Sequence, residues 1–192
     1  MRLVSLACRL AFVALACIAA PGFAQSPAPR TDDPRVMSEA ARKVYAQALR
    51  EARDLIDRKQ YGDAITRLDR VTAEHPREPQ ARFLKGIALA DEGHTDEAIA
   101  LFRALLADFP ELPEPRNNLA VLYAQKGEYA LARDELERAV QTAPDYAVAH
   151  ENLGDVYARL AEVEYERTVT LDKQNRTAAP KLKQIREVAL SR

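Results

Sequence analysis

Apolar residues recur every three or four positions between Glu114 and Pro144, in two runs separated by a single glycine. This spacing predicts two antiparallel amphipathic helices that are joined at Lys126-Gly127-Glu128, with Pro144 ending the second helix. The apolar stripes consist of Leu119, Ala120 and Tyr123 before the turn, and of Tyr129, Ala132, Leu136 and Ala139 after it.

The same pattern recurs when the chain is shifted back by 34 residues, and again after a second shift of 34. Gly127 falls on Gly93; Ala132 falls on Ala98 and then Ala64; Leu136 on Phe102 and then Leu68; Pro144 on Pro110 and then Pro76. One helix pair cannot bury its apolar face alone, so repeated pairs are expected to stack on one another.

A fourth copy of the pattern begins after Pro144 but lacks the turn. Five residues are missing between Tyr157 and Ala161, in the segment that contains Gly127 in the preceding copy. Tyr157, Ala161, Tyr165 and Val169 then share one helical face, which predicts a single long helix from Ala147 to about Leu171. After a break, a last helix from about Thr177 to Leu190 is expected to act as a C-terminal cap.

These residues resemble the tetratricopeptide repeat family, over roughly Tyr45 to Leu171. The resemblance implies an all-α fold, a right-handed α-solenoid of helix-turn-helix repeats with a fused long helix and a C-terminal capping helix. The Pro-Glu-Leu-Pro-Glu-Pro link at 110–115 and the turnless fourth repeat are similar to exported repeat proteins of proteobacteria.

Small residues recur where the two helices of a repeat should approach most closely, because a larger side chain would overpack there. They are Ala52, Gly86, Ala120 and Gly154 in the first helices, and Ala64, Ala98 and Ala132 in the second helices. One departure is Lys85, which stands where the family usually has a buried leucine. Its ammonium group is expected to extend out of the stack.

The expected organisation is a signal peptide (1–24), a disordered, proline-rich linker (25–37) and a tetratricopeptide repeat domain (38–192). Within that domain the repeats span 45–78, 79–112 and 113–146. A degenerate fourth repeat (147–175) and the cap (177–190) follow.

The N-terminal residues predict export. Arg2 and Arg9 flank a basic start, an apolar run follows, and Gly22 and Ala24 supply the small residues that a signal peptidase reads. Cleavage after Ala24 would make the protein periplasmic or secreted. The alternatives are a retained anchor or lipidation of Cys17, although alanine stands three residues before Cys17, where lipoprotein signals usually have leucine.

The net charge and the positions of the cysteines limit the classes of function that the sequence supports. Removing Arg2 and Arg9 from the 28 basic residues leaves 26 against 29 acidic residues, a net charge near −3, which does not indicate a nucleic-acid partner. Both cysteines, Cys8 and Cys17, lie in the predicted signal peptide. A cleaved chain would therefore have neither disulfides nor thiol catalysis.

The sequence contains no H-E-x-x-H, no G-x-S-x-G and no glycine-rich phosphate loop, and residues 25–192 have only three serines, Ser26, Ser38 and Ser191. We therefore predict that the protein is not an enzyme and needs no cofactor. The spacing of His75, His94 and His150 resembles no metal site, so no metal ligands are assigned. Lys181, Lys183 and Arg186 form a basic face of the last helix, which we interpret as solvated.

In repeats of this family the concave face is lined by fixed positions of the first helices. The resemblance therefore implies a partner-binding groove whose lining runs from basic through apolar and amide-rich to acidic. The corresponding residues are Arg50, Arg53, Phe83, Leu84, Ile87, Asn117, Asn118, Val121, Glu151, Asn152 and Asp155. Asn118 and Asn152, which are 34 residues apart, are expected either to hold an extended peptide backbone or to bond locally.

The function implied by this resemblance is a periplasmic protein-protein interaction scaffold that binds a peptide or protein segment in the groove. The alternative is a structural subunit that self-associates through its ends or its C-terminal helix. Membrane contact is expected only through an uncleaved or lipidated N-terminus. The identity of the partner and the oligomeric state do not follow from the sequence.

Overall fold

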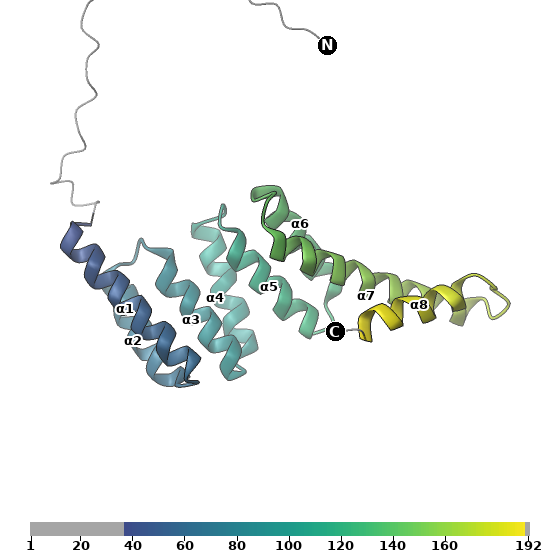
Figure 1. Ribbon diagram of the computed structural model, residues 1–192, viewed down its shortest axis with the longest axis horizontal. Helices are drawn as coiled ribbons and strands as arrows, with labels where there is room; N and C mark the ends of the chain where they lie inside the picture. Colours follow the sequence, from purple (N-terminus) through teal and green to yellow (C-terminus); the bar gives the residue numbers. More distant parts are fainter. Residues whose placement is uncertain (1–36, 191–192) are drawn as a thin grey trace, which may run out of the picture. The chain divides into compact units, whose positions relative to one another are not determined.

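The computed structural model describes residues 37–190, and in this part of the chain it contains eight α-helices and no strand (Figure 1). The all-helical prediction is confirmed. The predicted signal peptide, and the predicted linker up to residue 36, lie outside the described residues. The helices are α1 (Glu39–Asp57), α2 (Tyr61–Glu74), α3 (Pro79–Glu92), α4 (Thr95–Asp108), α5 (Pro113–Gln125), α6 (Tyr129–Thr142), α7 (Ala147–Leu171) and α8 (Ala178–Leu190).

The turns inside the first three helix pairs share one geometry. Each turn contains one residue with a positive φ angle, and these residues are spaced 34 apart: Lys59 (60°), Gly93 (96°) and Gly127 (76°). The next backbone N–H in each turn donates to a carbonyl five residues earlier, as from His94 to Leu89 at 2.8 Å. These bonds satisfy carbonyls that the helix ends would otherwise leave free. Glycine adopts this left-handed conformation readily. At Lys59 the same conformation costs about 1–2 kcal/mol of conformational free energy, because its Cβ atom is crowded by the backbone.

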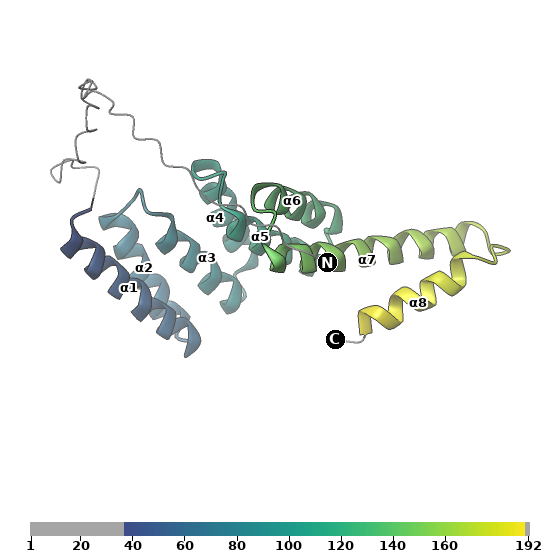
Figure 2. The same cartoon turned by 45° about the horizontal axis from the view of Figure 1, so that its top comes forward.

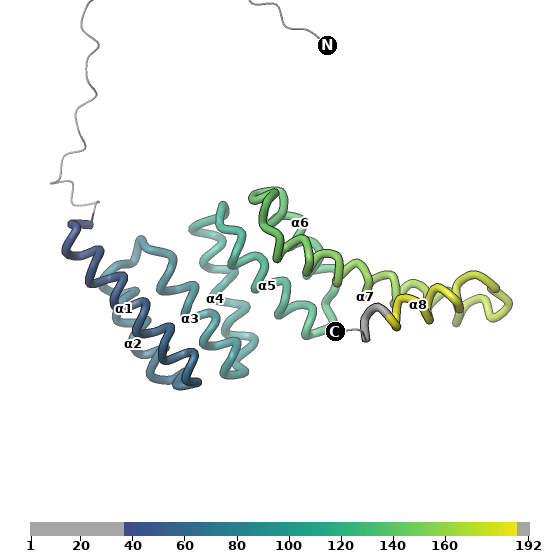
Figure 3. Tube along the Cα trace, viewed as in Figure 1, coloured from purple at the N-terminus to yellow at the C-terminus, as the bar shows by residue number. Residues whose placement is uncertain are grey.

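The helix pairs stack in sequence order, as the Cα tube shows (Figure 3). Each helix contacts the next one along the chain, and each first helix also contacts the first helix of the following repeat, α1 with α3, α3 with α5 and α5 with α7. Among the described residues, the second helices α2, α4 and α6 do not contact one another. The first helices therefore lie on the inner side of the stack, where neighbouring repeats are closest.

Small residues allow the close approach that the sequence indicated. Ala64, Ala98 and Ala132 are fully buried. Gly86 faces the Phe102 ring, and a Cβ atom at this glycine would lie only 2.4 Å from a ring carbon. Because Phe102 is itself completely buried, its ring has little room to move away. The side chain at position 86 is therefore limited by the ring opposite it.

Lys85 extends out of the stack as expected. Its Nζ lies 2.6 Å from Asp69 Oδ1 on α2, and its side chain is only about a quarter exposed. The aliphatic part of the lysine thus covers apolar surface while its charge remains paired near solvent.

The long fourth-repeat helix is present as α7, which runs without interruption from Ala147 to Leu171 (Figure 2). The close-packing role expected for Gly154 is wrong. A Cβ atom at Gly154 would meet nothing within 4 Å, and Tyr157 is 47% exposed whereas its repeat equivalent Tyr123 is 8% exposed. Without a turn, no second helix folds back to cover this face of α7.

Helix α8 contacts only α7 among the described helices, so it covers the second half of α7 and not the preceding repeats. Asn175 Oδ1 accepts bonds from the backbone N–H groups of Thr177 and Ala178 and so caps the start of α8. Arg186 pairs with Glu162 at 2.9 Å and also with Glu166. Arg186 remains about half exposed, as expected of a solvated face, but its guanidinium also reaches the acidic side chains of α7.

Charge pairing at the α7–α8 contact also affects ionisation. The Arg186 guanidinium, followed by that of Arg159, holds the pKa of the Glu162 carboxyl below its usual value. Lys181 Nζ lies 5.7 Å from the centre of the Tyr165 ring, within range of a cation–π interaction. Ala178 is buried, and Leu182 and Ile185 are partly buried. Apolar, charged and aromatic contacts therefore all contribute to the attachment of α8.

At the opposite end of the stack, burial raises the pKa of the Tyr45 phenol from 10.0 to about 12. Since the folded pKa lies above the unfolded value, this contribution to stability is complete below pH 10 and is lost as the pH rises through 12. We expect phenolate absorbance to show one tyrosine titrating near pH 12. Denaturant unfolding of Tyr45→Phe should show a weaker loss of stability over this pH range than the original chain, and an identical pH dependence would contradict the assignment.

Candidate binding groove

The inner face of the stack is formed by α1, α3, α5 and α7, and it carries most of the residues that the sequence analysis assigned to the groove. Arg50, Arg53, Val121 and Glu151 are exposed there. Phe83, Ile87, Asn118, Asn152 and Asp155 are partly exposed.

Two of the predicted groove residues are buried and need correction. Leu84 is 3% exposed and Asn117 is 6% exposed, so neither side chain is open to a partner. Neighbouring residues on a helix point about 100° apart, since a turn holds 3.6 residues. Leu84 and Ala88 therefore form the buried stripe of α3, whereas Phe83 and Ile87 form the stripe beside it.

Both Asn118 and Asn152 use their amide N–H groups for bonds within the protein. Asn118 Nδ2 donates to the backbone carbonyl of Glu114 in its own helix, at 2.9 Å. Asn152 Nδ2 donates to Asn117 Oδ1 across the α5–α7 contact, at 2.7 Å. Asn118 thus bonds locally, which was the alternative reading. The Asn117–Asn152 pair satisfies a buried amide and fixes the two inner helices relative to each other.

A first cleft lies at the N-terminal end of the inner face, with a volume of about 240 Å³. Its walls come from α1, α3 and the start of α5. Arg53 and Glu114 bring opposite charges to a lining that is otherwise mostly apolar. The remaining lining residues are Pro79, Gln80, Phe83, Leu112 and Pro115.

A second cleft, of about 320 Å³, lies between α5, the buried face of α6, and α7. It combines an apolar floor with a polar rim. The apolar lining is Ala120, Val121, Ala124, Tyr129, Leu136 and Val156. The polar lining is Gln125, Asn152, Asp155 and Arg159.

The structure adds a cation to the groove end that the sequence analysis described as acidic. Arg159 lines the second cleft, and its guanidinium lies 3.0 Å from Glu162. A sequence signal for it existed, because Arg159 follows Asp155 by four residues and so shares its helical face. The C-terminal end of the groove therefore carries both signs of charge.

The sequence places Tyr129 and Leu136 on the apolar stripe of a second helix, and in the structure both residues also line the second cleft. No periodicity marks such residues, because a cleft depends on how well neighbouring helices fill the space between them. Metal binding has no support in residues 37–190, where histidine and acidic side chains do not gather in groups of three that could hold an ion.

Two protein-family models, both described as tetratricopeptide repeat, match residues 49–113 and 89–153 of the chain. The TPR repeat-containing thioredoxin TTL4 of Arabidopsis thaliana is 37% identical over 82 residues, which are 43% of this chain and 12% of that protein. The match therefore spans only a small part of this relative.

Solved structures show the same fold. YrrB, described as a TPR protein with an unusual peptide-binding site, is 28% identical with a TM-score of 0.51, and the match covers 56% of this chain and 55% of YrrB. The Yersinia enterocolitica type III secretion chaperone SycD, in complex with a peptide of the translocator YopD, has a TM-score of 0.56 at 18% identity. That match covers 68% of this chain and 99% of SycD.

Proposed function

Because the chain belongs to the tetratricopeptide repeat family of protein-protein interaction scaffolds, we propose that its inner face binds a peptide or protein segment in the periplasm. The observation that carries this proposal is the pair of clefts on the face formed by the first helices. Each combines apolar walls with a few polar groups, the composition expected of a site that fixes and orients side chains.

Two relatives support a peptide as the kind of partner. YrrB is described as having a peptide-binding site, and SycD was solved with a translocator peptide. The proposed role is binding without catalysis. Thioredoxin chemistry, which the name of TTL4 mentions, uses a Cys-x-x-Cys pair. The two cysteines of this chain, Cys8 and Cys17, do not have that spacing.

Site-specific photocrosslinking tests the groove. A benzophenone amino acid at Val121, on the inner face, is expected to capture the partner in the native compartment. The same probe at Leu131 should not, because this apolar residue lies on the second helix α6 with comparable exposure, 47% against 36% for Val121. Capture at Leu131 and not at Val121 would move the binding site to the outer face.

Export is proposed from the N-terminal sequence. The protein recovered from the native host is expected to begin at Gln25, because Gly22 and Ala24 supply the small residues before the cut. Intact-mass measurement checks this result. A mass that retains residues 1–24, or a diacylglyceryl group on Cys17, would replace a released protein with an anchored one. None of the helices within residues 37–190 is long and apolar enough to cross a bilayer.

Self-association is the second candidate function, and the exposed apolar residues of α7 favour it. Leu171 is 79% exposed and Val163 is 43% exposed, on a helix whose second half is covered only by α8. Light scattering on the purified chain separates the two candidates. A concentration-independent monomer supports the groove, whereas a dimer that Val163→Asp dissociates supports the structural subunit.

A further inference from the structure

We propose that the second cleft is an anchor pocket for a tyrosine side chain of the partner segment. The proposal rests on the proposed function, because it names the side chain that would enter the groove. It concerns the cleft between α5, α6 and α7, whose floor and rim differ from the corresponding place one repeat earlier.

Comparison of repeat-equivalent positions explains why the floor is recessed. Val121 stands where the previous repeat has Ile87, Leu136 where it has Phe102, and Val156 where it has Leu122. All three replacements are smaller, and all three line the cleft. Ala120, which also lines it, is larger by one methyl group than its equivalent Gly86, and Tyr129 is larger than its equivalent Thr95. The result is an apolar floor beside an aromatic wall.

The volume leaves room for an aromatic side chain. Enclosed cavities of about 150 Å³ lined by apolar side chains hold benzene in other proteins, and this open cleft is larger, at about 320 Å³. An entering ring would also meet the face or edge of Tyr129, and aromatic pairs contribute beyond the area that they bury.

The polar groups at the rim of the cleft indicate which polar group the entering side chain carries at its end. Asn152 uses its amide N–H to hold Asn117, which leaves its carbonyl oxygen to accept a bond. Arg159 and Gln125 bring N–H donors to the same rim. A phenol hydroxyl both donates and accepts, so it matches a rim of mixed character better than a lysine, which only donates, or a phenylalanine, which does neither.

The test uses p-cresol, which has the tyrosine side-chain structure, and so does not require the partner. Methyl NMR spectra of the purified chain are recorded during titration. Saturable shifts are expected at Val121, Leu136 and Val156, and toluene should bind about two- to tenfold more weakly, the effect of one net hydrogen bond. No saturable shift, or binding of toluene equal to that of p-cresol, would overturn the proposal.

Ala124→Leu supplies the pocket variant, because its added atoms project from the cleft lining. We expect it to weaken p-cresol binding at least tenfold. Ala90→Leu is the matched control at the equivalent position of α3, where the residue is also a partly buried alanine, and it should leave binding unchanged. If Ala124→Leu does not fold, Val121→Phe fills the same cleft from an exposed position. Full p-cresol binding in a folded pocket variant would overturn the proposal.

The outcomes separate this proposal from the groove function. If the benzophenone at Val121 captures the partner while p-cresol does not bind, the groove function stands and the tyrosine anchor is overturned. If p-cresol binds and Ala124→Leu abolishes binding, but the partner is captured only at Leu131, both the groove function and the anchor role are overturned.

Discussion

Replacing Phe102 by alanine is expected to lower the free energy of unfolding by about 3–5 kcal/mol, the range measured when large aromatic side chains are removed from cores. Phe102 is completely buried, its ring centre lies 5.9 Å from that of Phe83, and it packs directly on Gly86. Denaturant unfolding measures the loss. Leu131→Ala, at a 47% exposed site on α6, is the control and should change stability by only about 0.5 kcal/mol.

The location of the destabilised helices in Phe102→Ala provides a second test. A solenoid is stabilised by nearest-neighbour interfaces, so removing Phe102 should loosen α3, α4 and α5 more than α1 or α8. Amide hydrogen exchange is expected to accelerate there first. Uniform acceleration across all helices would show that the chain unfolds as one cooperative unit.

The effect of a substitution at position 86 on stability should depend on the side chain at position 102. Gly86→Ala alone forces a methyl group against the ring, and overpacking of this kind costs about 1–3 kcal/mol. In a Phe102→Leu background the same change should be neutral or stabilising, because the pair then reproduces Ala120 and Leu136 of the next repeat. Strictly additive effects in this double-mutant cycle would contradict the direct contact.

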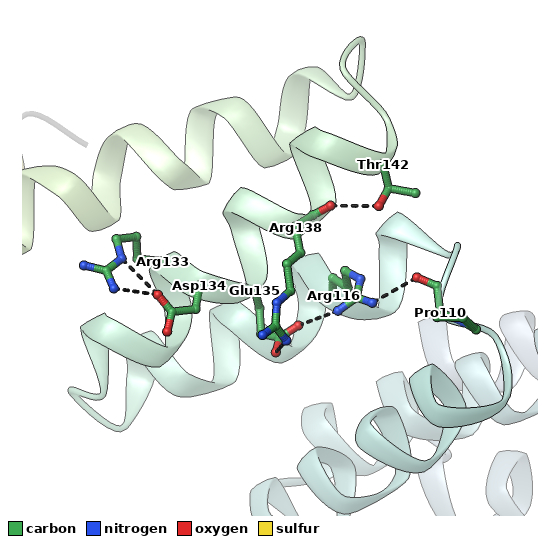
Figure 4. Close-up of polar contacts among 7 residues, drawn as sticks. All are labelled: Pro110, Arg116, Arg133, Asp134, Glu135, Arg138 and Thr142. Carbon is green, nitrogen blue, oxygen red and sulfur yellow. Dashed lines mark hydrogen bonds and ion pairs between the residues drawn. The ribbon is translucent and has the colours of Figure 1, made fainter.

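Arg116→Ala is expected to destabilise the fold by about 2–4 kcal/mol, because it leaves the largely buried Glu135 carboxylate with only the exposed Arg138, at 3.3 Å, as an ion-pair partner. The guanidinium links α5 to α6 and to the end of the preceding repeat (Figure 4). It lies 3.0 Å from Glu135 on α6 and donates to the Pro110 carbonyl at 2.9 Å, while belonging to α5 itself. The two side chains are only 13% and 16% exposed.

Two variants give this prediction its controls. Lys43→Ala breaks an ion pair with Glu39 in which both side chains are more than three-quarters exposed, so little change in stability is expected. Arg116→Met with Glu135→Leu removes both charges and should recover much of the stability lost by Arg116→Ala. Thermal unfolding compares the three. A loss in Lys43→Ala as large as in Arg116→Ala would rule out burial as the cause.

Several features of the fold depend on local sequence alone. The 34-residue period, the helix-ending prolines and the turn glycines predict which segments are helical, because these signals act within a few residues of the chain. The fused helix α7 is the clearest example. Deletion of the turn leaves one continuous apolar stripe, and a helix needs nothing further to continue through Ala161.

The sequence predicted which helices form the groove, but not which of their side chains are accessible to a partner. The resemblance correctly indicated that Val121, Asn152 and Asp155 come from first helices, and all three line the second cleft. Their exposure and bonding depend on the helix packed opposite. Asn152 is held by Asn117, a residue 35 positions away in the chain, and no local pattern records that bond.

The sequence by itself thus determined the eight helices of residues 37–190 and their stacking order, because helix periodicity and turn chemistry are short-range properties. Only the tertiary structure decided that Leu84 is buried, that Gly154 faces open space, and that Arg186 pairs with Glu162. It also decided that Leu136 lines a cleft, whereas its equivalent Phe102 is completely buried against Gly86. The physical reason is that burial, ion pairing and cleft volume are set by surfaces that meet only after the chain has folded.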